Sequence, residues 1–311
     1  MGVAASGPGK GRDLHGLSVS GLLCLLVIYL AWGSTYLAIR VAVREGAGWG
    51  PFWLGAARVL AAAAVLFALN RLRGVRLRPS RFELLTLAST GVLMWVGGNG
   101  IVNWAEQRVD SGLAALVVGT APLSVAAMEA MIDRRPPGLR LIGSLLVGMA
   151  GVGVLSFPML RSGVTADVLG VVGLTLAGVS WGYGTIVLNR RRLPLDPIVV
   201  AGWQQLAGGI GFAVVALAVR EPLPRPTPEA WAAWTYLMVV GSLVAFSCFV
   251  YAIKVLPTSV VMTYAYVNPA IAVLLGWLIL DEPITGYTLA GMALILAGVY
   301  GVFRDKTHRR G

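Results

Sequence analysis

The chain's first apolar run, residues 17–39, reads LSVSGLLCLLVIYLAWGSTYLAI. It contains no charged residue and is long enough to cross a bilayer as a helix, which needs about 20 apolar residues. Runs of the same kind follow at about residues 51–69, 84–105, 111–131, 141–160, 168–189, 197–219, 230–253, 259–280 and 285–303. These continuous runs indicate helices, because membrane-spanning strands are about 10 residues long and alternate in polarity.

The composition argues against a sizeable soluble domain. Of the 311 residues, 57% are hydrophobic and 13% are charged, whereas soluble domains carry roughly 25% charged residues. Cys24 and Cys248 lie inside apolar runs, and His15 and His308 lie in the polar ends. We therefore expect no disulfide framework, metal site, cofactor or His-based catalytic group, and no phosphate loop for ATP is present in the sequence.

The net charge of +11 is explained by topology better than by a nucleic-acid partner. If the N-terminus is cytoplasmic, 18 of the 25 Lys and Arg residues fall on the cytoplasmic side, 6 fall outside, and Arg58 lies within the membrane. Cytoplasmic loops of membrane proteins collect such residues. The distribution predicts ten spans with both termini in the cytoplasm.

The two halves of the chain repeat each other. A shift of about 147 residues, with small gaps, aligns Trp32 with Trp181, Pro51 with Pro197, Ser111 with Thr258, Pro122 with Pro269 and Gly151 with Gly298. Each half holds five predicted helices, and an odd number places the halves in opposite orientations. Inverted repeats are an architecture of secondary transporters, whose substrate site lies near the midplane between the halves.

The ninth run carries the most distinctive motif, Thr-Tyr-Ala-Tyr-Val-Asn-Pro at 263–269, followed by Gly276. The first run has Ala-Trp-Gly-Ser-Thr-Tyr at 31–36, and the third has Gly-Gly-Asn-Gly at 97–100. In these residues the chain resembles the EamA family of the drug/metabolite transporter superfamily, over about residues 18–303. The resemblance implies a ten-helix permease of the bacterial inner (plasma) membrane, with relatives that often export amino acids, metabolites or drugs.

The resemblance and the repeat together divide the chain into four parts. They are a cytoplasmic tail at 1–16, a first EamA repeat at 17–160, a second EamA repeat at 167–303 and a basic cytoplasmic tail at 304–311.

Polar and aromatic side chains inside the runs are candidates for a central cavity, because polar groups in a bilayer tend to face the bundle interior. The candidates are Trp32, Tyr36, Arg58, Asn99, Asn103, Trp181, Gln204, Gln205, Tyr264 and Asn268. The aromatic rings would pack against an apolar or cationic substrate. Asn and Gln also join membrane helices by hydrogen bonds, and Arg58 could pair with a neighbouring helix, so both interpretations stay open.

Three further residues have predicted roles in the transport cycle. Glu106 follows Asn99 and Asn103 at helical spacing and is a candidate for proton coupling, because burial raises the pKa of a carboxyl group; solvation near the outer helix end is the alternative. Pro122 and Pro269 break helices at matching positions, and paired breaks indicate a binding site or hinge.

These observations predict an all-α integral membrane protein of about ten helices in two inverted five-helix repeats. The expected function is a secondary transporter that exports small metabolites, amino acids or drugs by alternating access through a central cavity. A passive facilitator or channel of the same fold remains an alternative. A membrane enzyme is disfavoured, since the loops hold no visible cluster of His or carboxylate residues. The expected partners are a small-molecule substrate and the lipid bilayer, without nucleic acid.

Overall fold

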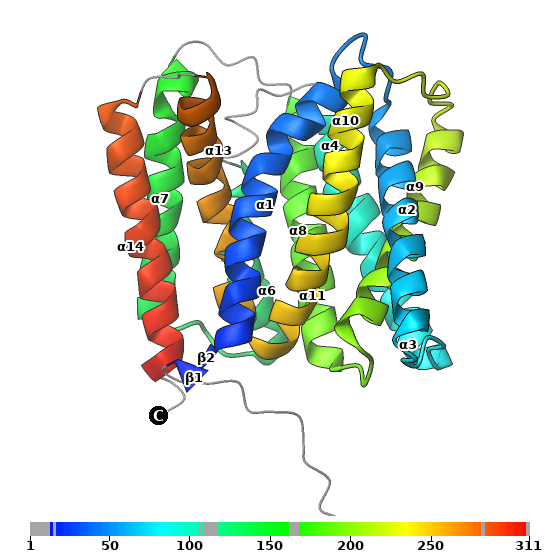
Figure 1. Ribbon diagram of the computed structural model, residues 1–311. Helices are drawn as coiled ribbons and strands as arrows, with labels where there is room; N and C mark the ends of the chain where they lie inside the picture. The colour runs from blue at the N-terminus through cyan, green and yellow to red at the C-terminus, as the bar shows by residue number, and fades with distance from the viewer. Residues whose placement is uncertain are drawn as a thin grey trace, which may run out of the picture.

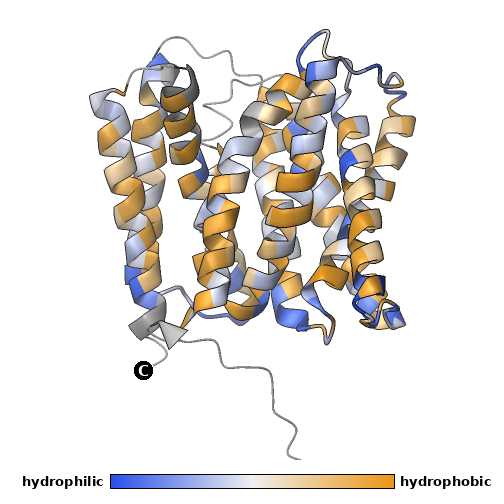
Figure 2. Ribbon diagram, in the orientation of Figure 1, coloured by the Kyte–Doolittle hydropathy of each residue, from blue (hydrophilic) through white to orange (hydrophobic). Residues whose placement is uncertain are grey.

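A computed structural model describes residues 13–14, 17–105, 107, 117–161, 168–280 and 284–308. In this part the chain is nearly all helical, and the helices lie side by side in one bundle (Figure 1). Two short strands, β1 (Asp13–Leu14) and β2 (Leu17–Ser18), pair antiparallel before the first helix. Hydrophobic residues follow the helices along their length, while hydrophilic residues gather near the helix ends (Figure 2), as expected of a bundle that is embedded in a bilayer.

The helices follow the order of the predicted runs. The first half contains α1 (Val19–Val43), α2 (Pro51–Leu72), α3 (Arg81–Gly91), the π-helix η1 (Val92–Gly100), α4 (Ile101–Ala105), α6 (Ala121–Asp133) and α7 (Leu139–Arg161). The second half contains α8 (Val168–Arg191), α9 (Pro197–Ala218), α10 (Pro228–Tyr236), the π-helix η2 (Leu237–Ala245), α11 (Phe246–Val255), α12 (Thr258–Val261), α13 (Tyr264–Leu280) and α14 (Gly286–His308).

Seven helical stretches of the described chain are long and apolar enough to cross a membrane. They are Pro51–Leu72, Arg81–Ala105, Leu139–Pro158, Val168–Arg191, Pro197–Ala218, Pro228–Val255 and Gly286–Asp305. The other three predicted spans include positions or side chains outside the described part, so the count of ten stays a prediction. Helix α1 begins and α14 ends at the same end of the bundle (Figure 1).

Proline and short polar side chains fix where several helices begin. Helices α2, α9 and α10 have Pro51, Pro197 and Pro228 in their first turn, where a missing N–H costs nothing and the proline φ angle suits a helix. The carboxylate of Asp196 accepts a hydrogen bond from the Ile198 amide at 2.9 Å and caps α9. Because these prolines lie in the first turn, they do not interrupt the hydrogen bonds of the apolar helices that follow.

Helices of one half pack against helices of the other. Helix α1 contacts α10, η2, α11 and α13, while α8 contacts α3, η1, α4 and α6. Two further pairs, α2 with α9 and α7 with α14, also cross between the halves. In the second pair a Cβ added at Gly151 would lie 2.6 Å from the Ile295 nitrogen, and one added at Gly298 would lie 2.5 Å from the Gly148 nitrogen. Glycine therefore permits this close contact, as small residues do in membrane bundles.

Candidate functional site

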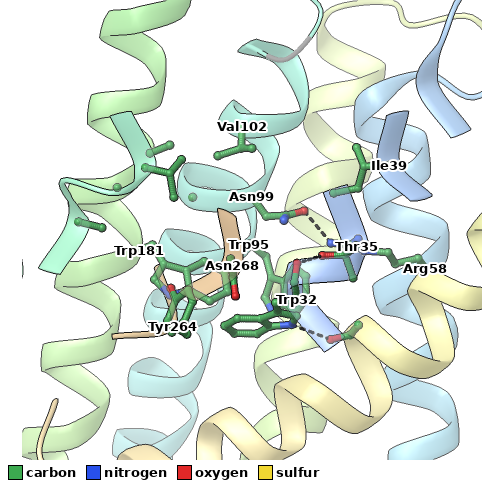
Figure 3. Close-up of a pocket in the computed structure, with 16 residues that line it drawn as sticks. Trp32, Thr35, Ile39, Arg58, Trp95, Asn99, Val102, Trp181, Tyr264 and Asn268 are labelled. Carbon is green, nitrogen blue, oxygen red and sulfur yellow. Dashed lines mark hydrogen bonds between the residues drawn. The ribbon is translucent and has the colours of Figure 1, made fainter. Parts of the chain in front are cut away.

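The described helices surround a cavity of about 110 Å³, to which both halves contribute. A volume of this order accommodates several water molecules or one small organic molecule. The described lining consists of Trp32, Thr35, Ile39, Arg58, Trp95, Gly98, Asn99, Val102, Val118, Ala121, Ala177, Gly178, Trp181, Gly241, Tyr264 and Asn268. Figure 3 labels ten of them, which come from α1, α2, η1, α4, α8 and α13.

Aromatic rings form one wall of the cavity. Trp32 packs edge to face against Trp181 and Tyr264, with ring centroids 5.6 and 4.9 Å apart. Trp95 lies 6.2 Å from Trp181, also edge to face. Phe249 supports Trp32 from behind at 5.2 Å and is fully buried. Edge-to-face contacts hold each ring in a fixed orientation, so the wall is a preformed apolar surface.

Arg58 places a positive charge at the cavity wall. Its side chain reaches inward from α2, and its Nη2 donates a hydrogen bond of 2.7 Å to Asn99 Oδ1 (Figure 3). The guanidinium carbon also lies 5.4 Å from the centre of the Trp95 ring, within the range of a cation–π interaction. The residue is only 4% exposed, and a guanidinium stays protonated under nearly all conditions. Among the described lining residues, Arg58 is the one with a formal charge.

Two π-helical segments, η1 and η2, occur at aligned positions of the two halves, and both reach the cavity. Segment η1 supplies Trp95, Gly98 and Asn99, and η2 supplies Gly241. A π-helix forms i→i+5 hydrogen bonds and is found frequently at functional sites. The paired segments therefore mark the region where a membrane helix of each half departs from regular geometry beside the cavity.

Side chains from the opposite half donate hydrogen bonds to carbonyl groups of the π-helical segments. Ser180 Oγ in α8 donates to the Leu93 carbonyl of η1 at 2.8 Å. Trp32 Nε1 in α1 donates to the Gly241 carbonyl of η2 at 3.2 Å. Each irregular segment is thus stabilised by the first helix of the other half, as buried backbone groups in a membrane require.

Three predicted cavity residues instead bond neighbouring helices and are not among the lining residues. Asn103, Gln204 and Gln205 are fully buried. Their side-chain amides donate from Asn103 Nδ2 to Pro51 O at 3.3 Å, from Gln204 Nε2 to Thr90 Oγ1 at 2.8 Å and from Gln205 Nε2 to Ser242 O at 3.2 Å. These amides serve as contacts between helices, which was the open alternative for this residue type.

The expectation that Asn99 and Asn103 share one face depended on regular α-helical spacing. The chain is π-helical up to Gly100 and α-helical from Ile101. Because a π-helical turn holds more residues than an α-helical turn, the 3.6-residue phase is broken between the two asparagines. Asn99 faces the cavity and Asn103 faces the first turn of α2.

The remaining predicted residues are placed as follows. Trp181, Tyr264 and Asn268 line the cavity with Trp32, Arg58 and Asn99. Tyr36 belongs to α1, but its side chain lies outside the described residues, and so does Glu106. Pro122 lies in the first turn of α6, and Pro269 lies inside α13, six residues after the turn at Thr263 that separates α12 from α13.

Several lining residues were not among the predicted candidates. Ile39 and Val102 are aliphatic and Gly178 has no side chain, so a search for polar and aromatic groups gave no reason to select them, whereas Thr35 and Trp95 met that criterion and were overlooked. Trp95 could have been found from its position, since it precedes Asn99 by four residues in the same helix. No signal in the sequence singled out Gly178. Within the described residues, no group of three or more His, Cys, Asp and Glu side chains could hold a metal ion.

A helical bundle of this hydropathy, with a cavity between two sequence repeats, is that of a multi-pass membrane transporter. The EamA-like transporter family matches residues 19–157 and 168–304, and the chain belongs to this family. It is 33% identical over 279 residues to the uncharacterized inner membrane transporter YedA of Escherichia coli strain K12, covering 88% of this chain and 86% of the relative. It is thus a multi-pass protein of the inner membrane with a small-molecule substrate.

Two more distant likenesses agree with this assignment. The chain is 25% identical over 287 residues to a probable terminal-alkyne amino-acid exporter of Streptantibioticus cattleyicolor, covering 92% of this chain and 94% of the relative. One solved crystal structure aligns with a TM-score of 0.78 at 23% identity, over 93% of this chain and 98% of the other. At that identity the structural likeness shows the fold alone.

Proposed function

We propose that the chain is a secondary transporter that exports small metabolites, amino acids or drugs by alternating access through the cavity between its repeats. The supporting observation is that the lining comes from both halves: Trp32, Arg58 and Asn99 from the first, Trp181 and Asn268 from the second. A site at a repeat interface can be opened to either side when the halves rock against each other. The named amino-acid exporter among the relatives supports export of a small organic solute.

The proposed topology has ten spans in two inverted five-helix repeats, with both termini in the cytoplasm. The common end at which α1 begins and α14 ends supports an even number of spans. Reporter fusions at residues 75, 136, 192 and the C-terminus should report the cytoplasm, and fusions at 46, 163, 224 and 283 the outside. A C-terminus found outside would overturn the even count. Glu106 remains the proposed proton-coupling residue, and Pro122 and Pro269 remain the proposed hinges.

Gly178 offers a way to block the cavity without disturbing the backbone. A Cβ added there would meet only the Ala121 Cβ, at 3.8 Å, and the position lines the cavity. We expect Gly178→Leu to fill the cavity and abolish transport while the protein remains folded in the membrane. The measurement is efflux from proteoliposomes for labelled amino acids, organic acids and organic cations, with and without a proton gradient.

Gly143 provides the matched control. A Cβ added at this position in α7 would meet nothing within 4 Å, and the residue is exposed on the outside of the bundle. Gly143→Leu should transport like the wild type. If Gly178→Leu also retains full transport, the cavity is not the pathway. If flux never exceeds the imposed solute gradient under any ion gradient, the protein is a passive facilitator of the same fold.

A further inference from the structure

A group of arginines lies where α6 and α8 end. Arg134 and Arg135 directly follow α6, and residues 190–192 at the end of α8 are all arginine. Arg190 Nη1 lies 2.7 Å from Asp133 Oδ1 at the end of α6, and this ion pair joins the two helix ends. These five arginines, the arginine cluster, therefore come from both repeats.

Hydrogen bonds place the cluster at the end of the bundle where α1 begins. Asn189 Nδ2 in α8 donates to the Ile253 carbonyl of α11 at 2.6 Å. Nearby in α11, the Tyr251 hydroxyl lies 2.7 Å from Ser20 Oγ in α1. Helix α14 ends at the same end (Figure 1). The cluster thus lies at one surface of the membrane and not in its interior.

Exposed apolar side chains adjoin the cluster. Met131 and Ile132 lie in the last turn of α6, and Leu139 lies at the start of α7; all three are exposed. In a membrane protein such side chains face the lipid tails, and an arginine directly beyond them reaches the layer of lipid headgroups. The cluster therefore lies at the depth of the lipid phosphates.

Much of the charge of the cluster is not neutralised by the protein. Asp133 is bonded to Arg190, and the charge of Glu129 also acts on Arg190. With the described residues, no hydrogen bond or ion pair is formed by the guanidinium groups of Arg134, Arg135 and Arg192. These three residues are exposed, so their charge is accessible to an anion from outside the protein.

Two arginines between α2 and α3 differ in this respect. Arg73 Nη2 lies 3.3 Å from Asp196 Oδ2, and Arg76 Nη2 lies 2.7 Å from Glu83 Oε2. The chain supplies a carboxylate for each of these two arginines, but none for three members of the cluster. The uncompensated charge is thus more local than the general excess of Lys and Arg on the cytoplasmic side of membrane proteins.

We propose that the arginine cluster binds the headgroup of an anionic phospholipid. The phosphate lies among the guanidinium groups of Arg134, Arg135 and Arg192, and the acyl chains lie along the exposed apolar residues Met131 and Ile132. The planar fork of a guanidinium matches the geometry of a phosphate, and each arginine near the membrane surface strengthens the attraction to anionic lipid. This interaction goes beyond transport and does not depend on it.

The test compares two lipids that have the same acyl chains and differ in the charge of the headgroup. Dioleoyl phosphatidylglycerol is anionic, and dioleoyl phosphatidylcholine is neutral overall. Each would be titrated into the purified, delipidated full-length protein, with bound lipid counted by native mass spectrometry and stability followed by melting. We expect phosphatidylglycerol to bind at least about tenfold more tightly. Equal binding of the two lipids would overturn the proposal.

Variants assign the preference to the cluster. Arg134→Gln and Arg192→Gln should each weaken phosphatidylglycerol binding about fivefold, the effect of one arginine at a membrane surface. Arg134→Lys should retain most of the binding, because its charge remains. Melting without lipid would verify that each variant is folded, and if one is not, the comparison of the two lipids in the wild type decides alone.

Arg220 provides the matched control. Its backbone is left-handed, with φ 53°, as in Arg134 and Arg192 at 51° and 42°, and it is also exposed. It precedes Glu221, which accepts a hydrogen bond from the Trp53 amide at the start of α2 and so lies at the opposite end of the bundle. Arg220→Gln should bind phosphatidylglycerol like the wild type. If it weakens binding as much as Arg134→Gln, the attraction is a property of the whole surface and the assigned site is wrong.

A soluble anion is the alternative occupant. Inorganic phosphate would be titrated alone and in competition with phosphatidylglycerol at constant ionic strength. We expect it to stabilise the protein much less than the lipid does, since it has no acyl chain to cover the apolar residues beside the cluster. Equal stabilisation by phosphate would identify a soluble-anion site and overturn the lipid assignment. None of these outcomes bears on transport, because no residue of the cluster belongs to the described cavity lining.

Discussion

Trp32 and Trp181 occupy aligned positions in the first helix of each repeat, yet their hydrogen bonds differ. Trp32 Nε1 donates to the Gly241 carbonyl of η2, whereas Trp181 Nε1 has no partner among the described residues. Beside it, Ser180 donates to η1 instead. Two halves of common ancestry therefore hold their π-helical segments in different ways. The two halves are therefore not equivalent where they meet at the cavity.

The repeats also differ in the polarity that they bring to the cavity. When Pro51 is aligned with Pro197, Arg58 corresponds to Gln204; with a shift of 147 residues, Asn99 corresponds to Phe246. Arg58 and Asn99 line the cavity, while Gln204 bonds Thr90 and Phe246 is buried behind Trp95. The charged end of the cavity thus belongs to the first repeat, and the corresponding second-repeat positions are structural.

The strongest test of this difference exchanges Arg58 and Gln204 for leucine, one at a time. Arg58→Leu should insert at least as well as the wild type, because leucine suits a bilayer better than arginine, but it should be inactive in efflux assays. Gln204→Leu should keep transport and lose stability by roughly 0.5–2 kcal/mol, the range for a hydrogen bond between membrane helices. Efflux and detergent melting would be measured on both.

The reverse outcome is equally informative. A large drop in melting temperature for Arg58→Leu would mean that Arg58 serves as a structural clamp whose removal leaves Asn99 without its donor. An active and stable Arg58→Leu protein would contradict both roles.

Asn268 provides the next largest expected effect. Asn268→Ala should lower transport several-fold without lowering membrane abundance, because the lost amide faces the cavity and its Oδ1 has no bond to lose among the described residues. The aligned position in the first repeat, Ala121, also lines the cavity and already has the smaller side chain. Immunoblots of membranes would measure abundance, and efflux assays would measure transport. A large loss of abundance would show that Asn268 is a structural contact between helices.

The two tryptophans differ in their hydrogen bonds, and this predicts a smaller effect, a difference in stability between their variants. Trp32→Phe and Trp181→Phe delete the same atoms, but only the first removes a described hydrogen bond. We expect Trp32→Phe to cost about 1 kcal/mol more stability than Trp181→Phe, the usual net contribution of one such bond. Equal melting temperatures of the two variants would show that the hydrogen bond of Trp32 does not contribute measurably to the stability of the fold.

The sequence predicted the helices of the described chain well because apolar runs and proline starts act locally along the chain. It was less informative about the site. The chemical type of a polar residue does not reveal whether it faces a cavity or a neighbouring helix. Asn99 and Gln204 both carry a side-chain amide, but Asn99 lines the cavity and Gln204 bonds Thr90. The π-helical segments rotate every residue that follows them, and they depend on contacts such as that of Ser180 with Leu93, which join residues far apart in the sequence.

The smallest expected effect concerns an ion pair that joins the repeats at a helix end. Arg190 in α8 donates to Asp133 at the end of α6, with Nη1 and Oδ1 2.7 Å apart. The hydrogen bond from Arg190, with the charges of Arg190 and Arg135, holds the pKa of the Asp133 carboxyl below its ordinary value, although desolvation raises it to a smaller extent.

A carboxyl whose folded pKa is depressed contributes stability above its unfolded pKa and loses it as the pH falls through the folded pKa. We therefore expect Asp133→Asn to melt slightly below the wild type at neutral pH and to match it in strong acid. Because both partners are substantially exposed, solvent screens the pair and the difference should be the smallest of the series. Melting curves of both proteins across the acidic range would show the convergence; a gap that widened as the pH fell would mean that Asp133 does not stabilise the fold through its charge.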